Sequence, residues 1–412
     1  MHYTKRAPMD DLSNTTTEKQ RSRVNRKVKD HGLFKIYSTI LSADQAYISA
    51  AVTDNTVDVE TIAERVYKAL GTLLKSEGYF VVHERVFAGL EYFDPVCRAR
   101  KKSLEACGIA SDTPLTFVQG RPIKSRGLAG IQLRAFKPTR EHDRVWTLYD
   151  NEQPVGRAWT RNDASFYMLQ NIHGNTRQDR YHQACDMFDR AQAILQKEGA
   201  SFKNVLRTWI YLSDILDWYA EFNRARNARF TEFGMLGLSE KENTEAEQIY
   251  LPASTGILGD NPRGAVGVMD VLAIAPDSKN VSIAQTAGVQ QKSPYRYGSA
   301  FSRAMTLKET DVTHILLSGT ASIDDHGKTV FQENTRAQIR KTFQVVEALI
   351  EHEGATLQDI NEATVFLKDE NDIDLYWQVV EEFGIKDFPA IFIVADVCRP
   401  DLLFEIDATI AY

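Results

Sequence analysis

One pattern of helix, Glu-Gly and strand occurs three times along this chain of 412 residues. The clearest copy opens at Asn334 with a predicted helix whose apolar residues recur at helical spacing. That helix ends at Glu353-Gly354, because glycine readily adopts the left-handed conformation that closes many helices. A strand over 363–367, rich in β-branched and aromatic residues, follows, and then a second helix over 373–383.

The two earlier copies follow the same order. The second opens a helix at Asn175-Thr176-Arg177, ends it at Glu198-Gly199, and continues with a strand over 206–212 and a helix over 217–233. The first and faintest has a helix over 59–74, Glu77-Gly78, a strand over 80–87 and a helix over 92–106. Predicted strands lie before each copy (34–52, 165–170, 314–322) and after it (115–136, 264–275, 390–410). The predicted order of elements in each copy is therefore ββ-α-β-α-ββ.

The repeat predicts an α/β (α+β) chain of tandem units. A sheet that is covered by helices on one face must bury its other face against a neighbour, and three such sheets around one axis satisfy that need. We expect a disordered leader over 1–30, a degenerate repeat over 31–137, and two further repeats over 145–276 and 290–412. A charged linker would lie over 137–144, and residues 277–311 would hold the link between the second and third repeats. Chance similarity remains the alternative for the first copy, since this order of elements is common in α/β proteins.

Composition excludes several classes of function. The net charge is −7 and no basic stripe is present, which argues against a nucleic-acid partner. The longest apolar runs, such as 389–395, are too short to span a bilayer. Residues 1–30 are polar and charged, without the apolar segment that we would expect in a signal peptide. Neither a CxxC pair nor a Cys/His cluster with zinc spacing occurs. We expect a cytoplasmic protein without cofactor or metal, an internal pseudo-trimer that is monomeric, with weak self-association left open.

The third copy resembles the RidA/YjgF family over 313–412. The resemblance rests on Ile315-Leu316-Leu317-Ser318-Gly319-Thr320, 364–369, Phe388-Pro389-Ala390 and 403–407. Proteins of that family are trimers with ligand clefts between subunits, so the resemblance implies a trimer made within one chain. RidA imine deaminases carry an arginine two residues after the proline, where it binds the substrate carboxylate. Ile391 stands there, and Ile393 replaces a nearby family cysteine, which argues against imine deamination.

A narrower resemblance, to the chorismatases, extends over 205–412. It rests on segments that occur in the same order: 207–211, the helix of Arg226, 252–257, Tyr297-Gly298 with 301–304, and 396–406. Chorismatases are fused YjgF-like enzymes that cleave chorismate to pyruvate and a hydroxybenzoate or a dihydroxylated cyclohexadiene acid. This chain differs in having only Ser299-Ala300 where they have a Pro/Arg-rich insert, and in its extra first repeat.

Glu405 is the candidate catalytic acid. Strand alternation places it with Leu403 and Asp407 on one face, and Phe404 and Ile406 on the other. A carboxyl among apolar neighbours has a raised pKa and can act as a general acid near neutral pH. The resemblance implies that Glu405 protonates the enolpyruvyl methylene of chorismate. The alternative is a solvated carboxylate on an edge strand.

Chorismate is a dicarboxylate and needs cations, for which arginine is well suited. The candidate substrate-binding residues are Arg207, Arg226, Tyr297, Arg303 and Lys368. Surface ion pairs, or packing for the tyrosine, are the alternatives. Cys398 is the second candidate catalytic residue, on the strength of the resemblance: it lies seven residues before Glu405, a spacing that in chorismatases marks the 3-hydroxybenzoate branch. Without that resemblance it would be an ordinary core cysteine.

The sequence thus predicts a chorismatase-like lyase or hydrolase that takes a small-molecule carboxylate, with a cleft at Glu405 whose walls come from the second and third repeats. Two alternatives stay open: a RidA-like enzyme for another enol ether, an enamine or an imine, and a small-molecule-binding protein without catalysis.

Overall fold

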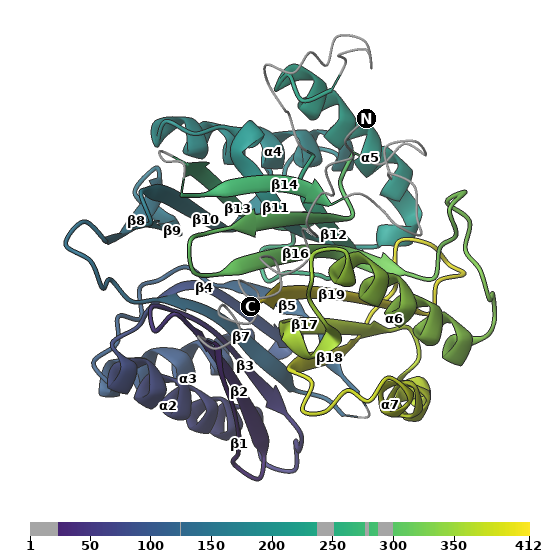
Figure 1. Cartoon of the computed structure of the whole chain (residues 1–412), viewed down its shortest axis with the longest axis horizontal. Coiled ribbons are helices and arrows are strands. Elements are labelled where there is room, and N and C mark those ends of the chain that lie inside the picture. Colours follow the sequence, from purple (N-terminus) through teal and green to yellow (C-terminus); the bar gives the residue numbers. More distant parts are fainter. Residues whose placement is uncertain (1–23, 124, 237–250, 277–279, 287–299) are drawn as a thin grey trace, which may run out of the picture.

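The computed structural model describes residues 24–123, 125–236, 251–276, 280–286 and 300–412. Three β-sheets surround the centre of the molecule, and each carries its helices on the side that faces away from that centre (Figure 1). The C-terminus lies near the middle, where the sheets approach one another.

The first sheet, at the N-terminal end of the chain, has the order β1-β2-β3-β7-β4-β5. Its elements are β1 (Val24–Asp30), β2 (Phe34–Leu41), β3 (Gln45–Val52), α2 (Val59–Glu77), β4 (Phe80–Ala88), α3 (Phe93–Ala106), β5 (Thr116–Gln119) and β7 (Leu128–Phe136).

The second sheet has the order β12-β11-β13-β10-β9-β8. Its elements are β8 (Val145–Asp150), β9 (Gln153–Arg161), β10 (Ala164–His173), α4 (Arg180–Lys197), β11 (Val205–Leu212), α5 (Ile215–Glu232), β12 (Ala253–Leu258) and β13 (Gly267–Pro276).

The third sheet has the order β14-β15-β16-β19-β17-β18-β6. Its elements are β14 (Ser282–Thr286), β15 (Ala304–Lys308), β16 (Thr313–Ala321), α6 (Thr335–Glu351), β17 (Ile360–Leu367), α7 (Ile373–Glu382), β18 (Ala390–Val394) and β19 (Phe404–Ala411). The short β6 (Arg121–Pro122), from the first repeat, is added at its edge beside β18.

The three sheets share one topology, apart from the added β6. Each runs through three strands in sequence, then the last strand of its repeat, then the two strands that flank the second helix. The predicted tandem repeat is therefore confirmed. Each repeat has one more strand than the predicted ββ-α-β-α-ββ, because three strands precede its first helix. The range 34–52 covers β2 and β3, whereas 165–170 and 314–322 cover only β10 and β16, so β9 and β15 were missed along with β1, β8 and β14.

Two sequence-based expectations were wrong at these extra strands. Residues 24–30, which we expected in a disordered leader, form β1 and pair with β2 along their whole length. Within the expected link over 277–311, β14 and β15 pair with each other and belong to the third sheet. Both β1 and β14 are edge strands with mostly exposed side chains, so they lack the alternation of apolar residues that reveals a half-buried strand.

The predicted helices are all present, with small differences at their ends. Gly199 and Gly354 have φ angles of 77° and 83° after their helices, the left-handed conformation expected there. The helix predicted from Asn175 begins only at Arg180. The Asp179 side chain caps it by accepting a hydrogen bond from the backbone N–H of His182.

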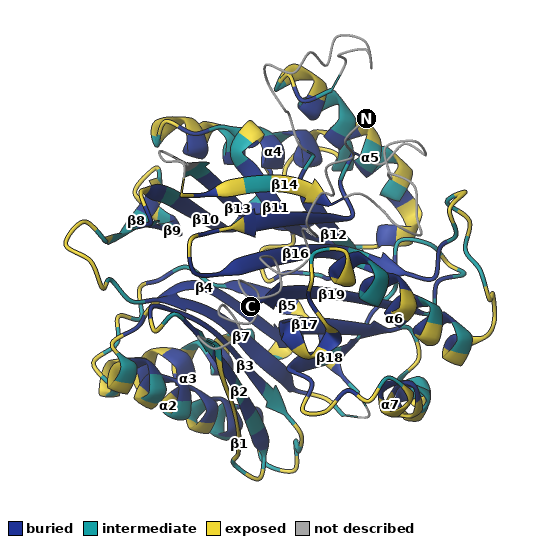
Figure 2. Cartoon of the chain, in the orientation of Figure 1, coloured by how far each residue is buried: buried dark blue, intermediate teal, exposed yellow. Residues whose placement is uncertain are grey.

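Two kinds of core hold the repeats. Each repeat has a separate core between its sheet and its helices, and a further core forms where the inner faces of all three sheets meet. Phe87, Trp209 and Phe366 supply this central core from the three repeats in turn. Figure 2 shows the central strands as buried and the outer helix faces as exposed. The inner faces are thus buried against one another, as the repeat required.

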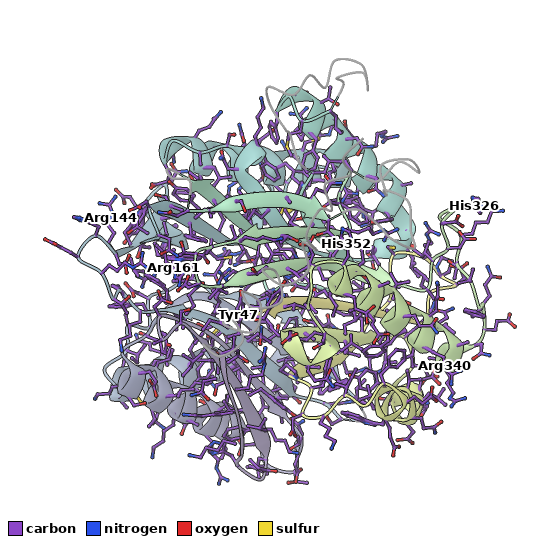
Figure 3. The ribbon with its side chains drawn as sticks, in the orientation of Figure 1. Tyr47, Arg144, Arg161, His326, Arg340 and His352 are labelled. Carbon is purple, nitrogen blue, oxygen red and sulfur yellow. The ribbon has the colours of Figure 1, made fainter. Side chains whose placement is uncertain are left out.

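Buried ion pairs and a buried His–Asp hydrogen bond join the repeats across these faces. His83 pairs with Asp270 at 2.8 Å, Arg207 with Asp407 at 3.4 Å, and Arg85 with Glu362 at 2.6 Å. Arg161, at the end of β9, contacts Asp44 of the first repeat and Glu309 of the third. Arg161 lies well inside the outline of the molecule in Figure 3, whereas Arg340 projects from its periphery. No described helix is long and apolar enough to cross a membrane.

Candidate functional site

A small cleft lies between the second and third repeats, and we call it the Glu405 cleft. It encloses about 50 Å³. The second repeat contributes side chains from α5 and β12, and the third contributes β16, β19 and the segment before β15. Its lining consists of Tyr219, Arg226, Ser254, Gly256, Phe301, Arg303, Gly319, Ala321, Ile323, Cys398, Arg399 and Glu405. The expectation that repeats two and three form the walls therefore agrees with the geometry.

Glu405 lies on β19 and is only 5% exposed. Phe404 and Ile406 belong to the core under the helices, so Glu405 faces the other way, as strand alternation predicted. Burial raises the pKa of the Glu405 carboxyl to about 8, and the neighbouring Asp407 carboxylate acts in the same direction. The opposing effects of Arg303 and Arg207 are smaller. At neutral pH this carboxyl is therefore mostly protonated.

Gly319 provides the space that the Glu405 carboxyl occupies. It lies in an irregularity of β16, where the register with β19 shifts between Leu317 and Thr320. A Cβ atom at position 319 would collide with Oε1 of Glu405, so the site requires glycine here. The adjacent Ser318 hydroxyl donates to the carbonyl of Ser302 at 2.6 Å and accepts from the Ser254 N–H at 2.7 Å. This serine ties β12 of the second repeat to the third.

Arg226 brings a buried positive charge to the cleft from α5. It is 2% exposed, and its Nη2 donates to Oδ1 of Asn223 at 2.5 Å. Its guanidinium lies 5.4 Å from the centre of the Phe301 ring. Burial lowers its pKa, and no Asp or Glu among the described residues forms an ion pair with it. A buried cation of this kind is suited to bind an anionic ligand.

Arg303 and Arg399 add to the positive charge. Arg303 is 3% exposed and lies 5.8 Å from the Phe301 ring, on which Arg226 also packs. Arg399 donates through Nη1 to the carbonyl of Gly327 at 2.7 Å. Among the described residues, three arginines line the cleft, and the one carboxyl there, Glu405, is largely neutral. The electrostatics favour an anionic ligand.

Cys398 lines the cleft beside Tyr219. Burial and the Glu405 charge raise the pKa of the Cys398 thiol to about 12, so it stays protonated at neutral pH. Burial also raises the pKa of the Tyr219 hydroxyl, with Cys398 the next cause. Both groups can therefore offer hydrogen bonds to a ligand but are poor nucleophiles.

Two predicted cations lie elsewhere. Arg207 is buried in the interface between the sheets, where it donates to the hydroxyl of Thr255 at 2.5 Å and pairs with Asp407. It does not line the cleft, because its strand position directs it to the central core. Lys368 donates to the carbonyl of Pro400 at 2.7 Å and lies 3.5 Å from Asp396, also outside the lining. Tyr297 lies outside the described residues.

Sequence reasoning missed Tyr219, Ser254 and Arg399. Tyr219 precedes Arg226 by seven residues, which is two helical turns, so their shared helix face was a signal in the sequence. Ser254 offered no such signal, because its part in the cleft depends on how β12 meets β16. In the described parts of the chain, no three His, Cys, Asp or Glu side chains gather as metal ligands would.

Comparisons with known proteins give a family match for the third repeat and a similar fold for most of the chain. Residues 297–412 match the family model described as endoribonuclease L-PSP, which corresponds to the RidA/YjgF family predicted from the sequence. A crystal structure of a chorismatase is similar with a TM-score of 0.58 and 17% identity, covering 80% of this chain and 93% of that one. That match is longer than residues 145–412, so the likeness extends into the first repeat.

Single-repeat proteins also match. A putative endoribonuclease L-PSP from Entamoeba histolytica is 15% identical, with a TM-score of 0.28, over 32% of this chain and 100% of its own. The YjgF gene product of E. coli is 26% identical, with a TM-score of 0.21, over 24% of this chain and 79% of its own. The family match therefore covers the third repeat, and the fold of the chain is similar to that of the chorismatase structure.

Proposed function

We propose that this protein is a chorismatase-like enzyme that cleaves the enol ether of chorismate and releases pyruvate. The observation that carries the proposal is the buried Glu405 carboxyl, mostly protonated at neutral pH, in a cleft that the buried arginines Arg226 and Arg303 also line. A proton donor in a cleft with two buried cations matches an acid-labile enol ether that bears carboxylates.

The chemistry begins with proton transfer. The Glu405 carboxyl gives its proton to the terminal methylene carbon of the enolpyruvyl group, and the adjacent ether carbon becomes an oxocarbenium ion. Water adds to that carbon and loses a proton to the Glu405 carboxylate, which restores the acid. In the resulting hemiketal the bond to the ring oxygen then breaks, the hydroxyl loses its proton to become the carbonyl of pyruvate, and the ring oxygen gains a proton to become the ring alcohol. No outside oxidant or cofactor enters this balance.

The arginines would hold the two carboxylates. A bidentate contact from a guanidinium fixes a carboxylate in one orientation, and burial strengthens the contact. The cleft encloses only about 50 Å³, which is less than a cyclic dicarboxylate needs. Binding therefore requires lining side chains to move apart, and Phe301, only partly buried between Arg226 and Arg303, is the one we expect to move.

Imine hydrolysis of the RidA type has less support. The position of the family arginine is Ile391, which is fully buried and packs toward Gly130 of the first repeat. Strand β12, which borders the Glu405 cleft, corresponds to β18 of the third repeat. The residue of β12 that corresponds to Ile391 is Thr255, because Thr255 pairs with Trp209 in the same way as Ile391 pairs with Thr364. Neither residue can bind a carboxylate as arginine does.

The test is incubation with chorismate, with pyruvate followed through lactate dehydrogenase. We expect turnover by the wild type and a loss of about 10³-fold in kcat for Glu405→Gln, which keeps the shape but cannot give a proton. Glu381→Gln, an exposed carboxylate on α7, is the matched control and should keep full activity. Absence of pyruvate from the wild type would exclude chorismate as the substrate, and tight chorismate binding without turnover would instead indicate a binding protein.

A further inference from the structure

A second cleft lies between the third and first repeats, at the place that corresponds to the Glu405 cleft by the internal symmetry. We call it the Trp377 cleft. It encloses about 620 Å³, within the size range of small-molecule sites. Its apolar lining includes Tyr37, Val52, Ala129, Ile373, Trp377 and Phe392. Helix α7 and strand β18 form one wall, as α5 and β12 do in the Glu405 cleft.

The register identifies the corresponding residues. Gly130 pairs with Ala51 and Phe87, just as Glu405 pairs with Ala321 and Phe366, so glycine replaces the catalytic acid. A Cβ at Gly130 would collide with Ile391, which leaves no room for a carboxyl.

Aromatic side chains replace the other polar groups. Tyr37 lies opposite Ser49 as Arg303 lies opposite Ser318. Trp377 is the fifth residue of α7, as Tyr219 is of α5. The Trp377 cleft has thus lost the acid and the arginine, and has gained a tryptophan.

The charged side chains of this cleft are few. Among the residues that the structure describes, those in its lining are Lys35 and Asp54, of opposite sign. Lys35 lies 3.9 Å from Asp30, and Asp54 accepts the backbone N–H of Thr56 at 2.8 Å. The Glu405 cleft, in contrast, has three arginines and one carboxyl. Charge complementarity therefore favours an uncharged ligand here.

Trp377 supplies the recognition surface. This residue is 48% exposed. The centre of its ring lies 5.2 Å from that of Phe392 and 5.0 Å from that of Tyr376. These contacts hold the indole in place while leaving about half of it open in a cleft. An ordered, half-exposed aromatic ring gains free energy when a flat apolar molecule covers it.

We propose that the Trp377 cleft is a second small-molecule site, which binds a neutral aromatic ligand and performs no chemistry on it. This inference is independent of the proposed function, because it uses no residue of the Glu405 cleft.

The test uses a matched pair of fluorescent probes on the full chain. N-phenyl-1-naphthylamine is neutral, and 8-anilino-1-naphthalenesulfonate has the same rings with an added negative charge. We expect one neutral probe to bind per chain, and about tenfold weaker binding by Trp377→Ala. Phe80→Ala, which removes a ring that is 52% exposed on β4, is the control and should bind like the wild type. Trp377→Phe should retain most of the affinity.

The anionic probe should bind at least about tenfold more weakly than the neutral one. Glu405→Gln should leave binding of the neutral probe unchanged even if it abolishes pyruvate release. The proposal is overturned if the neutral probe does not saturate, if Trp377→Ala binds as the wild type does, or if the anionic probe binds equally well. Thermal denaturation of each variant checks that a loss of binding is not a loss of fold.

Discussion

The Glu405 cleft and the Trp377 cleft are built from the same strands and helices of successive repeats, yet their chemistry differs. The Glu405 cleft has a buried carboxyl and three arginines. The Trp377 cleft has glycine at the position that corresponds to the acid, and aromatic rings line it. Because burying a charge is costly, we expect the two clefts to differ in stability as well as in function. A repeat that does no catalysis can replace its ionisable groups by packing, as Ile391 does against Gly130.

The largest predicted effect is on the free energy of unfolding, which the buried Glu405 carboxyl lowers. The Trp377 cleft has glycine at the corresponding position and does not have this cost. The pKa of Glu405 rises on folding from its usual 4.5 to about 8, so the folded state binds this proton more tightly. The carboxyl therefore lowers stability progressively as pH rises from about 4.5 to 8. Glu405→Gln should be more stable than the wild type above pH 8, by at most roughly 5 kcal/mol, with the two converging near pH 4.

Urea denaturation at several pH values measures this difference. Glu381→Gln, on the surface of α7, is again the control and should follow the wild type. Equal stability of Glu405→Gln and the wild type at pH 9 would show that the carboxyl is not held protonated.

The second prediction removes a cation from each cleft in turn. Arg226→Ala should lower kcat/KM for chorismate by about 100-fold or more, because a buried charged contact to a carboxylate is lost. Lys35→Ala, in the Trp377 cleft, should leave kcat/KM unchanged. Steady-state kinetics with both variants decides whether catalysis belongs to one cleft, and an equal loss in the two would contradict that division.

The third prediction adds one methyl group to each cleft. Gly319→Ala should lower kcat by about tenfold or more, because the new Cβ displaces the Glu405 carboxyl. Gly130→Ala meets Ile391 instead and should cost about 1–3 kcal/mol of stability with little change in kcat. Melting curves and kinetics on both variants separate the two effects; a loss of activity in Gly130→Ala at unchanged stability would refute the assignment.

The smallest effect is expected at Cys398. Its thiol stays protonated at neutral pH, so it acts through shape and hydrogen bonding rather than as a nucleophile. Cys398→Ser should therefore change the rate of pyruvate release by no more than about threefold. A complete loss of turnover would assign the thiol a covalent role.

Much of the fold was visible in the sequence because it depends on local patterns. The helices and their closing glycines, such as Gly199 and Gly354, follow from spacing within a few turns. Edge strands β1 and β14 were missed because water covers them, which leaves no apolar alternation to detect. The acid Glu405 and the cation Arg226 could be chosen because a family resemblance pointed to them.

The rest of the site depends on contacts between repeats. Arg207 looked like a ligand-binding cation on sequence grounds, but its partner Asp407 lies 200 residues away and holds it in the central interface. Ser254 enters the site only because Ser318 of the next repeat accepts its N–H. Strand alternation shows that such side chains are on one face; it does not show which face of another repeat lies opposite.

The most direct test of the central claim is the pH dependence of kcat/KM for pyruvate release from chorismate. If Glu405 acts as a general acid with a pKa near 8, the rate is constant below that pH and falls tenfold per pH unit above it. Glu405→Asp, which keeps a carboxyl, should retain a descending limb, whereas Glu405→Gln should lose both the rate and the limb. A rate that rises with pH through 8, or a descending limb that persists in Glu405→Gln, would contradict the account.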